Sequence, residues 1–267
     1  MIRINDTIIN QGHFPDGTLL TKFDPYDPEL QYDTEIRFEW IYESDAELFT
    51  LICLKRHIDH FFGSDAYITL YMPYIPNARM DRVKNADEVF TLKYFCEVIN
   101  SLHFDAVLVL DAHSNVSLAL LNNVVALTPI KQIERVIDMC DDPVLFFPDE
   151  GSMKRYSEQL HVPYSFGVKK RDWDTGKIIR LDVMFPENVK DKDVLIVDDI
   201  CSYGGTFLHS AKALKEAGAN KIYLFVTHCE QSVFNGEMIS SGLISKIYTT
   251  DSLFPRDKQN DIIKIVD

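Results

Sequence analysis

Short apolar runs recur along the chain, and most of them are followed by polar or glycine-containing segments. Runs of this length without polar interruption are typical of strands that are covered on both faces of a sheet. The predicted strands are residues 67–72, 106–110, 143–147 and 194–197. Because such strands are separated by longer stretches, we expect mostly parallel sheets.

Between these strands, apolar residues return at helical spacing. The predicted amphipathic helices are residues 44–63, 87–102 and 206–218. Ser44 and Glu47 have the spacing of a capping box, and Gly63 and Gly218 are suited to ending a helix. Strands alternating with helices predict an α/β fold in which helices flank each sheet.

Three of the predicted strands are followed by an acid, namely Asp111, Asp149 (after Pro148) and Asp198. This repetition predicts two similar lobes that join near residues 127–129. We expect an N-terminal lobe of residues 1–128, to which residues 259–267 return, and a C-terminal lobe of residues 129–258.

The segment from Val194 to Thr206 carries the most chemical information. Asp198 and Asp199 are expected at the carboxyl end of a buried strand, where open α/β sheets bind ligands. Gly204 and Gly205 allow backbone amides to approach an anion, and Thr206 is expected to cap the next helix. Carboxylates for sugar hydroxyls beside amides for a phosphate predict a ribose-phosphate site.

Composition narrows the possible partners. The net charge of −14 disfavours nucleic acid and anionic membranes as partners, so we expect small-molecule substrates. Five scattered cysteines without a CxxC pair indicate a reducing compartment. The chain shows no signal-peptide pattern and no apolar run long enough for a bilayer, so we expect a cytoplasmic location.

Residues 167–180 contain a second charged feature. Lys169, Lys170, Arg171, Lys177 and Arg180 form a basic island on an acidic protein, and residues 174–176 are a turn signal. This pattern predicts a basic hairpin. Two interpretations agree with this pattern: a hairpin exposed to solvent, and a flap that closes over phosphates.

The order of the short motifs resembles that of the phosphoribosyl pyrophosphate synthetase family, which has the type I phosphoribosyltransferase fold. The matching segments are Phe14–Thr18, Pro73–Arg82, Leu110–Ser114, Pro148–Gly151, Lys169–Arg171, Asp198–Thr206 and Val226–His228. The resemblance implies transfer of a diphosphoryl group from ATP to the anomeric hydroxyl of a ribose 5-phosphate unit, with release of AMP. It also implies Mg²⁺, ATP as co-substrate, and a homo-oligomer.

Roles for individual residues follow from the same resemblance. It implies ATP contacts for Phe14, Asp16, Thr18, Arg79, Met80 and Asp81, and ribose-phosphate contacts for Asp198, Asp199, Ser202, Tyr203, Gly204, Gly205 and Thr206. His113 and Asp149 are expected to contact the metal, with Asp111 as a direct or water-mediated ligand. The catalytic residues are expected to be His113, Arg171 and either Lys169 or Lys170.

The chain departs from the family pattern at Thr18 and Met80, where the family has glutamate and glutamine, and at Ser202 and Tyr203 in the phosphate loop. Tyr203 suggests an acceptor whose 5-phosphate is extended, such as ADP-ribose, as an alternative to ribose 5-phosphate. Two other functions stay open: a type I phosphoribosyltransferase and a non-catalytic subunit associated with a synthetase.

Overall fold

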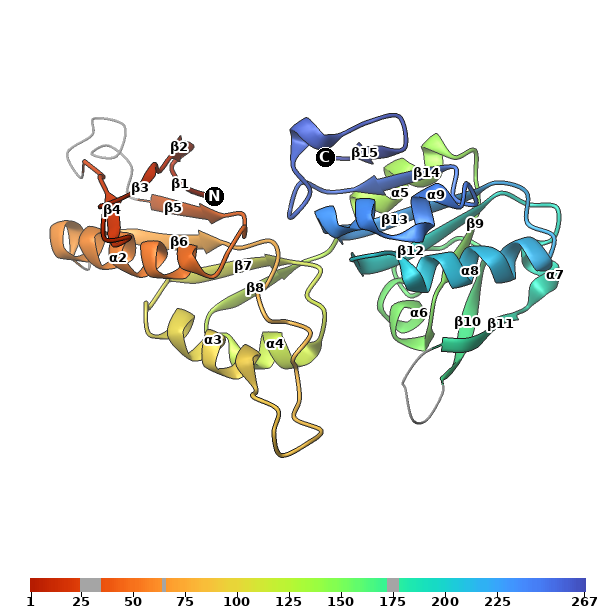
Figure 1. Cartoon of the computed structure of the whole chain (residues 1–267), viewed down its shortest axis with the longest axis horizontal. Coiled ribbons are helices and arrows are strands. Elements are labelled where there is room, and N and C mark those ends of the chain that lie inside the picture. Colours follow the sequence, from red (N-terminus) through yellow and green to blue (C-terminus); the bar gives the residue numbers. More distant parts are fainter. Residues whose placement is uncertain (25–34, 64–65, 172–177) are drawn as a thin grey trace. The chain divides into compact units, whose positions relative to one another are not determined.

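The chain divides into two compact units, residues 1–127 and 128–267, in the computed structural model (Figure 1). The structure describes residues 1–24, 35–63, 66–171 and 178–267. Each unit has its own sheet and its own hydrophobic core, so the two are described separately. Within the described ranges, no helix combines the length and apolar character needed to cross a bilayer.

Unit 1 contains a sheet with the strand order β2-β1-β5-β6-β7-β8. Strands β5 to β8 are parallel, whereas β1 and β2 add an antiparallel edge. The strands are β1 (Ile2–Ile4), β2 (Thr7–Ile8), β5 (Glu35–Trp40), β6 (Tyr67–Tyr71), β7 (Ala106–Leu110) and β8 (Val124–Leu127). The helices are α2 (Ala46–Phe62), α3 (Thr91–Asn100) and α4 (Asn115–Leu120), and β3 (Gln11–His13) and β4 (Leu19–Thr21) form a separate hairpin.

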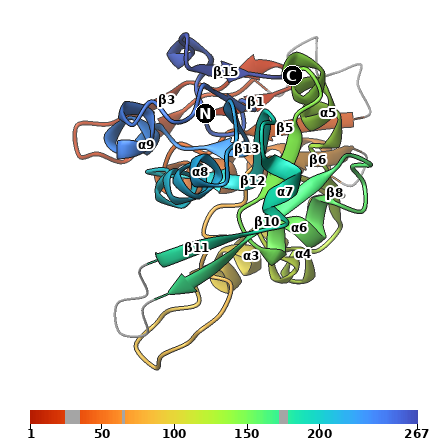
Figure 2. The same ribbon diagram turned by 90° about the vertical axis from the view of Figure 1, so that its right-hand side faces the viewer.

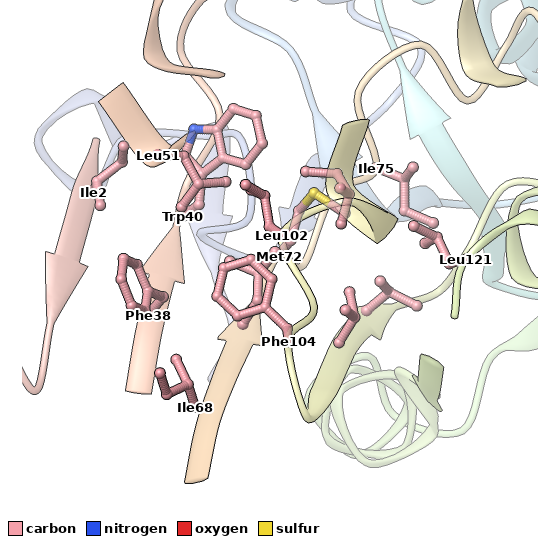
Figure 3. Packing of buried hydrophobic residues seen from close by; sticks show 14 of the residues in the cluster. Ile2, Phe38, Trp40, Leu51, Ile68, Met72, Ile75, Leu102, Phe104 and Leu121 are labelled. Atoms are coloured by element: carbon pink, nitrogen blue, oxygen red, sulfur yellow. The ribbon is translucent and has the colours of Figure 1, made fainter. Parts of the chain in front are cut away.

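The core of unit 1 lies between its sheet and helices. Figure 3 shows Phe38 and Trp40 of β5 packed among side chains from neighbouring strands and helices. Trp40 is 1% exposed, and its indole nitrogen donates to the Glu47 carboxylate at 3.0 Å. Burial of one such side chain contributes about 1.5–3 kcal/mol, so this cluster accounts for much of the unit's stability.

The start of α2 differs from the predicted capping box. The N-cap is Asp45, and no side-chain hydrogen bond caps the helix there. Glu47 instead accepts hydrogen bonds from the amides of Glu43 and Ser44, at 2.8 and 3.4 Å, as well as from Trp40. The hydrogen bond in which the Ser44 side chain would cap the helix is absent, because the helix starts one residue later than the pattern requires.

Unit 2 contains a sheet with the order β11-β10-β9-β12-β13-β14-β15. Its strands are parallel except β11, which pairs antiparallel with β10. The strands are β9 (Val144–Phe147), β10 (Tyr164–Arg171), β11 (Ile178–Met184), β12 (Val194–Cys201), β13 (Ile222–Cys229), β14 (Lys246–Thr249) and β15 (Ile263–Ile265). The helices are α5 (Ile130–Met139), α6 (Glu150–Tyr156), α7 (Pro186–Val189), α8 (Gly205–Glu216), α9 (Glu237–Ser240), η1 (Gln231–Asn235) and η2 (Arg256–Lys258).

The placement of the C-terminal segment corrects the expectation that residues 259–267 return to the N-terminal lobe. Strand β15 pairs in parallel with β14, and Ile263 lies opposite Ile247. Both isoleucines are completely buried in the core of unit 2. The last strand therefore completes the second sheet, because its apolar residues fill a position at the edge of that core.

The predicted basic hairpin is present as strands β10 and β11. Figure 2 shows this strand pair extending away from the rest of unit 2. Lys169 pairs with Leu181 and Lys170 with Arg180, and the register shifts between Lys170 and Arg171. The predicted turn at residues 174–176 lies outside the described residues.

Helix α3 is shorter than predicted, since it begins at Thr91 instead of residue 87. Glu88 accepts hydrogen bonds from the amides of Lys84 and Asn85, at 2.6 and 3.3 Å. These bonds hold a turn in the segment that periodicity alone assigned to the helix. The local side-chain interaction therefore decides where the helix starts.

Candidate active site

The two acids of the phosphate-loop segment were predicted at the carboxyl end of their strand, but they lie within β12, which continues past them to Cys201. The strand continues to Cys201 because its pairing with β13 persists, with Asp198 opposite Val226 and Cys201 opposite Cys229. Asp198 is partly buried, and Asp199 is only 5% exposed. Both carboxyl groups therefore belong to a rigid sheet position, where they can hold a ligand in one orientation.

Asp149 follows β9 as the N-cap of α6, where its carboxylate accepts a hydrogen bond from the Ser152 amide at 3.1 Å. The other carboxylate oxygen accepts from the Lys169 ammonium group at 2.7 Å. Burial alone would raise the pKa of Asp149, but Lys169 and the amides of Ser152 and Gly151 together hold it below its usual value. The structure thus joins two residues of the expected site as a charged pair.

Asp198 has the opposite electrostatic setting. Burial raises its pKa well above the usual range, and the nearby carboxylates of Asp199 and Asp149 raise it further. The Asp199 amide, which donates to Asp198 at 3.1 Å, and the Lys169 charge only partly offset this effect. Two further acids, Asp199 and Asp149, lie close to Asp198, so the site attracts hydrogen-bond donors such as sugar hydroxyls.

Arg155 is a charged residue of this cluster that the sequence analysis did not single out. It lies in the last turn of α6, and one guanidinium nitrogen is 3.1 Å from a carboxylate oxygen of Asp199. The available signal was its position in the short helix that follows Asp149. Its partner could not be read from the sequence, because Asp199 lies on a distant strand.

The loop from Ser202 to Gly204 leads directly into α8. Gly204 is the N-cap of that helix with φ of 78°, so Thr206 is not the cap that the sequence predicted but lies inside the first turn. A side chain at Gly204 would lie 2.7 Å from the Met238 sulfur, and one at Gly236 would lie 1.9 Å from the Tyr203 carbonyl oxygen. Close packing on the segment that includes α9 therefore holds the loop in one shape.

The amides at the start of α8 are available to an anion, because a helix leaves its first N–H groups without partners inside the helix. Tyr203 at the loop is 61% exposed. The backbone of Lys170 and Arg171 belongs to β10, whereas their side chains lie outside the described part of the structure.

In unit 1, the segment after β6 meets the connection after β7. The amide of Leu110 donates to the Pro73 carbonyl oxygen at 3.0 Å. Arg82 binds both carboxylate oxygens of Asp81, at 2.8 and 3.2 Å. The pKa of Asp81 is lowered first by the hydrogen bonds from Arg82, and also by the charge of His113. Asp81 thus links the two segments that carry Arg79, Met80 and His113.

Arg79 is exposed and Met80 partly exposed, so both are accessible to a ligand, whereas Asp81 is 8% exposed. Asp111 is buried and has φ of 46°, an unusual backbone conformation for a residue other than glycine. This geometry turns the chain sharply from β7 towards His113. Asp111 thus shapes the connection after β7, and its role as a direct or water-mediated metal ligand stays a prediction.

The Phe14–Thr18 segment forms the loop of the β3–β4 hairpin, and the Phe14 amide donates to the Thr18 carbonyl oxygen at 2.9 Å. Phe14 is 50% exposed. The Thr18 hydroxyl donates to the Asp16 carboxylate at 2.7 Å, which lowers the pKa of Asp16. Thr18, which replaces the family's glutamate, thus stabilises the loop through Asp16.

Among the residues that the structure describes, no three His, Cys, Asp or Glu side chains gather as they would around a metal ion. The expected metal contacts are divided between the units, with Asp111 and His113 in unit 1 and Asp149 in unit 2.

Comparisons with known proteins place the chain in a known group. The phosphoribosyl transferase domain family matches residues 152–233. The ribose-phosphate pyrophosphokinase of Sulfurisphaera tokodaii is 31% identical over 199 residues, which cover 71% of this chain and 66% of that protein. The corresponding protein of Saccharolobus solfataricus is 29% identical over 192 residues, which cover 70% of this chain and 65% of that protein. The chain thus spans slightly less than two thirds of the length of these relatives.

The phosphoribosylpyrophosphate synthetase structure from Mycobacterium smegmatis has the same fold, with a TM-score of 0.75 and 17% identity, covering 97% of this chain and 85% of that one. Fold and site together define an α/β protein of two phosphoribosyltransferase-type lobes. The chain belongs to the phosphoribosyl pyrophosphate synthetase, or ribose-phosphate pyrophosphokinase, family.

Proposed function

We propose that this chain transfers the diphosphoryl group of ATP to the anomeric hydroxyl of a ribose 5-phosphate unit and releases AMP. The gathering of Asp149, Lys169, Asp198 and Asp199 around β12, the strand that leads into the loop before α8, carries this proposal. Names of the curated relatives support the same reaction.

In this reaction the anomeric oxygen forms a bond to the β-phosphorus of ATP. The bond between that phosphorus and the oxygen bridging it to the α-phosphorus breaks, so AMP leaves and the hydroxyl proton passes to water. Asp198 and Asp199 would orient the ribose hydroxyls, and amides of Gly204, Gly205 and Thr206 would bind the 5-phosphate. Lys169 would neutralise charge on the transferred phosphoryl group, with Arg171 in the same role.

The contacts to ATP and magnesium are proposed for each unit by itself. In unit 1, Arg79 would bind ATP phosphates through its guanidinium fork, Phe14 would contact the adenine ring, and His113 would be a metal contact. In unit 2, the Asp149 side chain is 45% exposed and offers carboxylate oxygen, the donor that Mg²⁺ prefers, so it fits a metal contact. Magnesium, when bound, would neutralise part of the negative charge on the phosphates.

The decisive experiment measures AMP formation from ATP and Mg²⁺ in the presence of ribose 5-phosphate, with products identified by mass. A diphosphorylated ribose 5-phosphate formed in equal amount to AMP is expected. A phosphoribosyltransferase would be favoured instead if the chain exchanges a base in a reaction that depends on pyrophosphate and forms no AMP. Absence of both reactions would favour the non-catalytic subunit.

ADP-ribose is a second candidate acceptor, since it carries the same anomeric hydroxyl with a nucleotide attached to the 5-phosphate. The observation that favours it is Tyr203, whose ring is 61% exposed at the phosphate loop and could pack on the added group. The comparisons give no support to this acceptor. Substitution of Tyr203→Thr should then shift the ratio of kcat/KM values towards ribose 5-phosphate, and an unchanged ratio would exclude the idea.

A further inference from the structure

Helix α6 carries a charged side chain of the site at each end. Asp149, its N-cap, pairs with Lys169 of β10, and Arg155, in its last turn, pairs with Asp199 of β12. The helix also packs against β12. This short helix therefore contributes one residue to each of two ion pairs, and these pairs link it to β10 and to β12.

The Arg155–Asp199 pair is well shielded from solvent. The Asp199 side chain is 8% exposed and that of Arg155 is 29% exposed. A buried carboxylate that loses its cationic partner is strongly destabilised, because the charge has been removed from water without compensation. Arg155 therefore has a larger influence on Asp199 than an ion pair on the surface would have.

The two adjacent acids of β12 are held differently. In Asp199, one oxygen accepts from the Ile200 amide at 2.9 Å and the other lies 3.1 Å from Arg155. In Asp198, one oxygen accepts from the Asp199 amide at 3.1 Å. The two neighbouring carboxylates are therefore held by different partners, and only that of Asp199 has a cationic side chain within ion-pair distance among the residues that the structure describes.

We propose that Arg155 is a positioning residue that fixes the charge and orientation of Asp199, so that the Asp198–Asp199 segment presents one defined geometry to the hydroxyls of the acceptor. This inference rests on the proposed function, and it concerns acceptor binding in particular. Arg155 acts through Asp199 and need not touch the acceptor itself.

The test compares Arg155→Met, Arg155→Lys, Asp199→Asn and the double variant Arg155→Met/Asp199→Asn. Lys154→Met is the matched control, because Lys154 is the preceding residue of α6 and forms an exposed pair with Glu150 at 3.6 Å. For each variant, KM for ribose 5-phosphate, KM for ATP and kcat are measured at saturating Mg²⁺, together with the thermal midpoint.

We expect Arg155→Met to raise KM for ribose 5-phosphate about tenfold or more, because Asp199 would lose the partner that holds it and its own contact to the acceptor would weaken. KM for ATP should stay within about twofold of the wild-type value. Arg155→Lys should raise KM for ribose 5-phosphate much less than Arg155→Met, because lysine keeps the positive charge. The double variant should be no weaker than Asp199→Asn alone, and Lys154→Met should match the wild type.

Additive losses in the double variant, or equal weakening of ATP and acceptor binding, would overturn the proposal. If Arg155→Met does not fold, the Arg155→Lys and Asp199→Asn pair decides the question by the same comparison. Calorimetric binding of ribose 5-phosphate to wild type and Arg155→Lys separates this inference from the proposed function. A wild type that binds the acceptor but releases no AMP would refute only the proposed reaction.

Discussion

The ammonium group of Lys169 lies 2.7 Å from a carboxylate oxygen of Asp149, which is the N-cap of α6. The pair joins β10, the first strand of the basic hairpin, to the segment after β9. Lys169, which is expected to neutralise a phosphoryl group, therefore forms an ion pair with Asp149, which is expected to contact the metal.

Substitution of Lys169→Met should lower kcat for AMP formation by about 100-fold or more, the usual effect of removing one group that stabilises developing charge. Lys170→Met is the matched control, since Lys170 is the next residue of the same strand. Its effect should be much smaller. A larger loss from Lys170→Met would assign the catalytic role to Lys170. The measurement is steady-state AMP release at saturating ATP and acceptor.

Substitution of Arg79→Met should raise KM for ATP about tenfold and leave KM for the acceptor nearly unchanged. The reason is that an exposed guanidinium in the Pro73–Arg82 segment can bind phosphates in a bidentate manner. Lys84→Met, which removes an exposed cation from the same region, serves as the control and should have little effect. Equal changes in both variants would indicate a general charge effect instead of a specific contact.

The unfolding temperature of Asp198→Asn should exceed that of the wild type at pH 7 in metal-free buffer. Burial raises the pKa of Asp198, so its ionised form costs folding free energy that grows as pH rises above the unfolded value of about 4. The difference should shrink below that pH, where both states are protonated. Each kcal/mol corresponds to about 2–4 °C in a chain of this size. Glu216→Gln, which removes an exposed carboxylate on α8, is the matched control measured in the same pH series.

Substitution of Gly204→Ala should destabilise the fold by about 1–3 kcal/mol, because the residue has φ of 78° and a side chain there would collide with Met238. Gly205→Ala is the matched comparison, since a side chain at Gly205 meets no atom within 4 Å. It should keep or slightly raise the free energy of unfolding, which denaturant titration measures. Equal losses in both variants would show that the loop is not held by this packing.

Several elements could be predicted because their signals are local. The strand at Ala106–Leu110 matches the predicted residues, and the strand at Tyr67–Tyr71 ends one residue before the predicted limit. Continuous apolar runs identify buried strands without knowledge of their partners. Helix limits were less accurate, since hydrogen bonds such as those of Glu88 depend on side-chain conformation.

The features of the site also fall into those that the local sequence predicts and those that it does not. Residue type and spacing along the chain were enough to predict the α/β class, the acids that follow apolar runs, the basic hairpin and the glycine loop. The folded chain was needed to see that β15 joins the second sheet, that Gly204 caps α8, and that Arg155 pairs with Asp199. These features depend on contacts between residues far apart in the chain, and local pattern holds no information on which distant partner a side chain will meet.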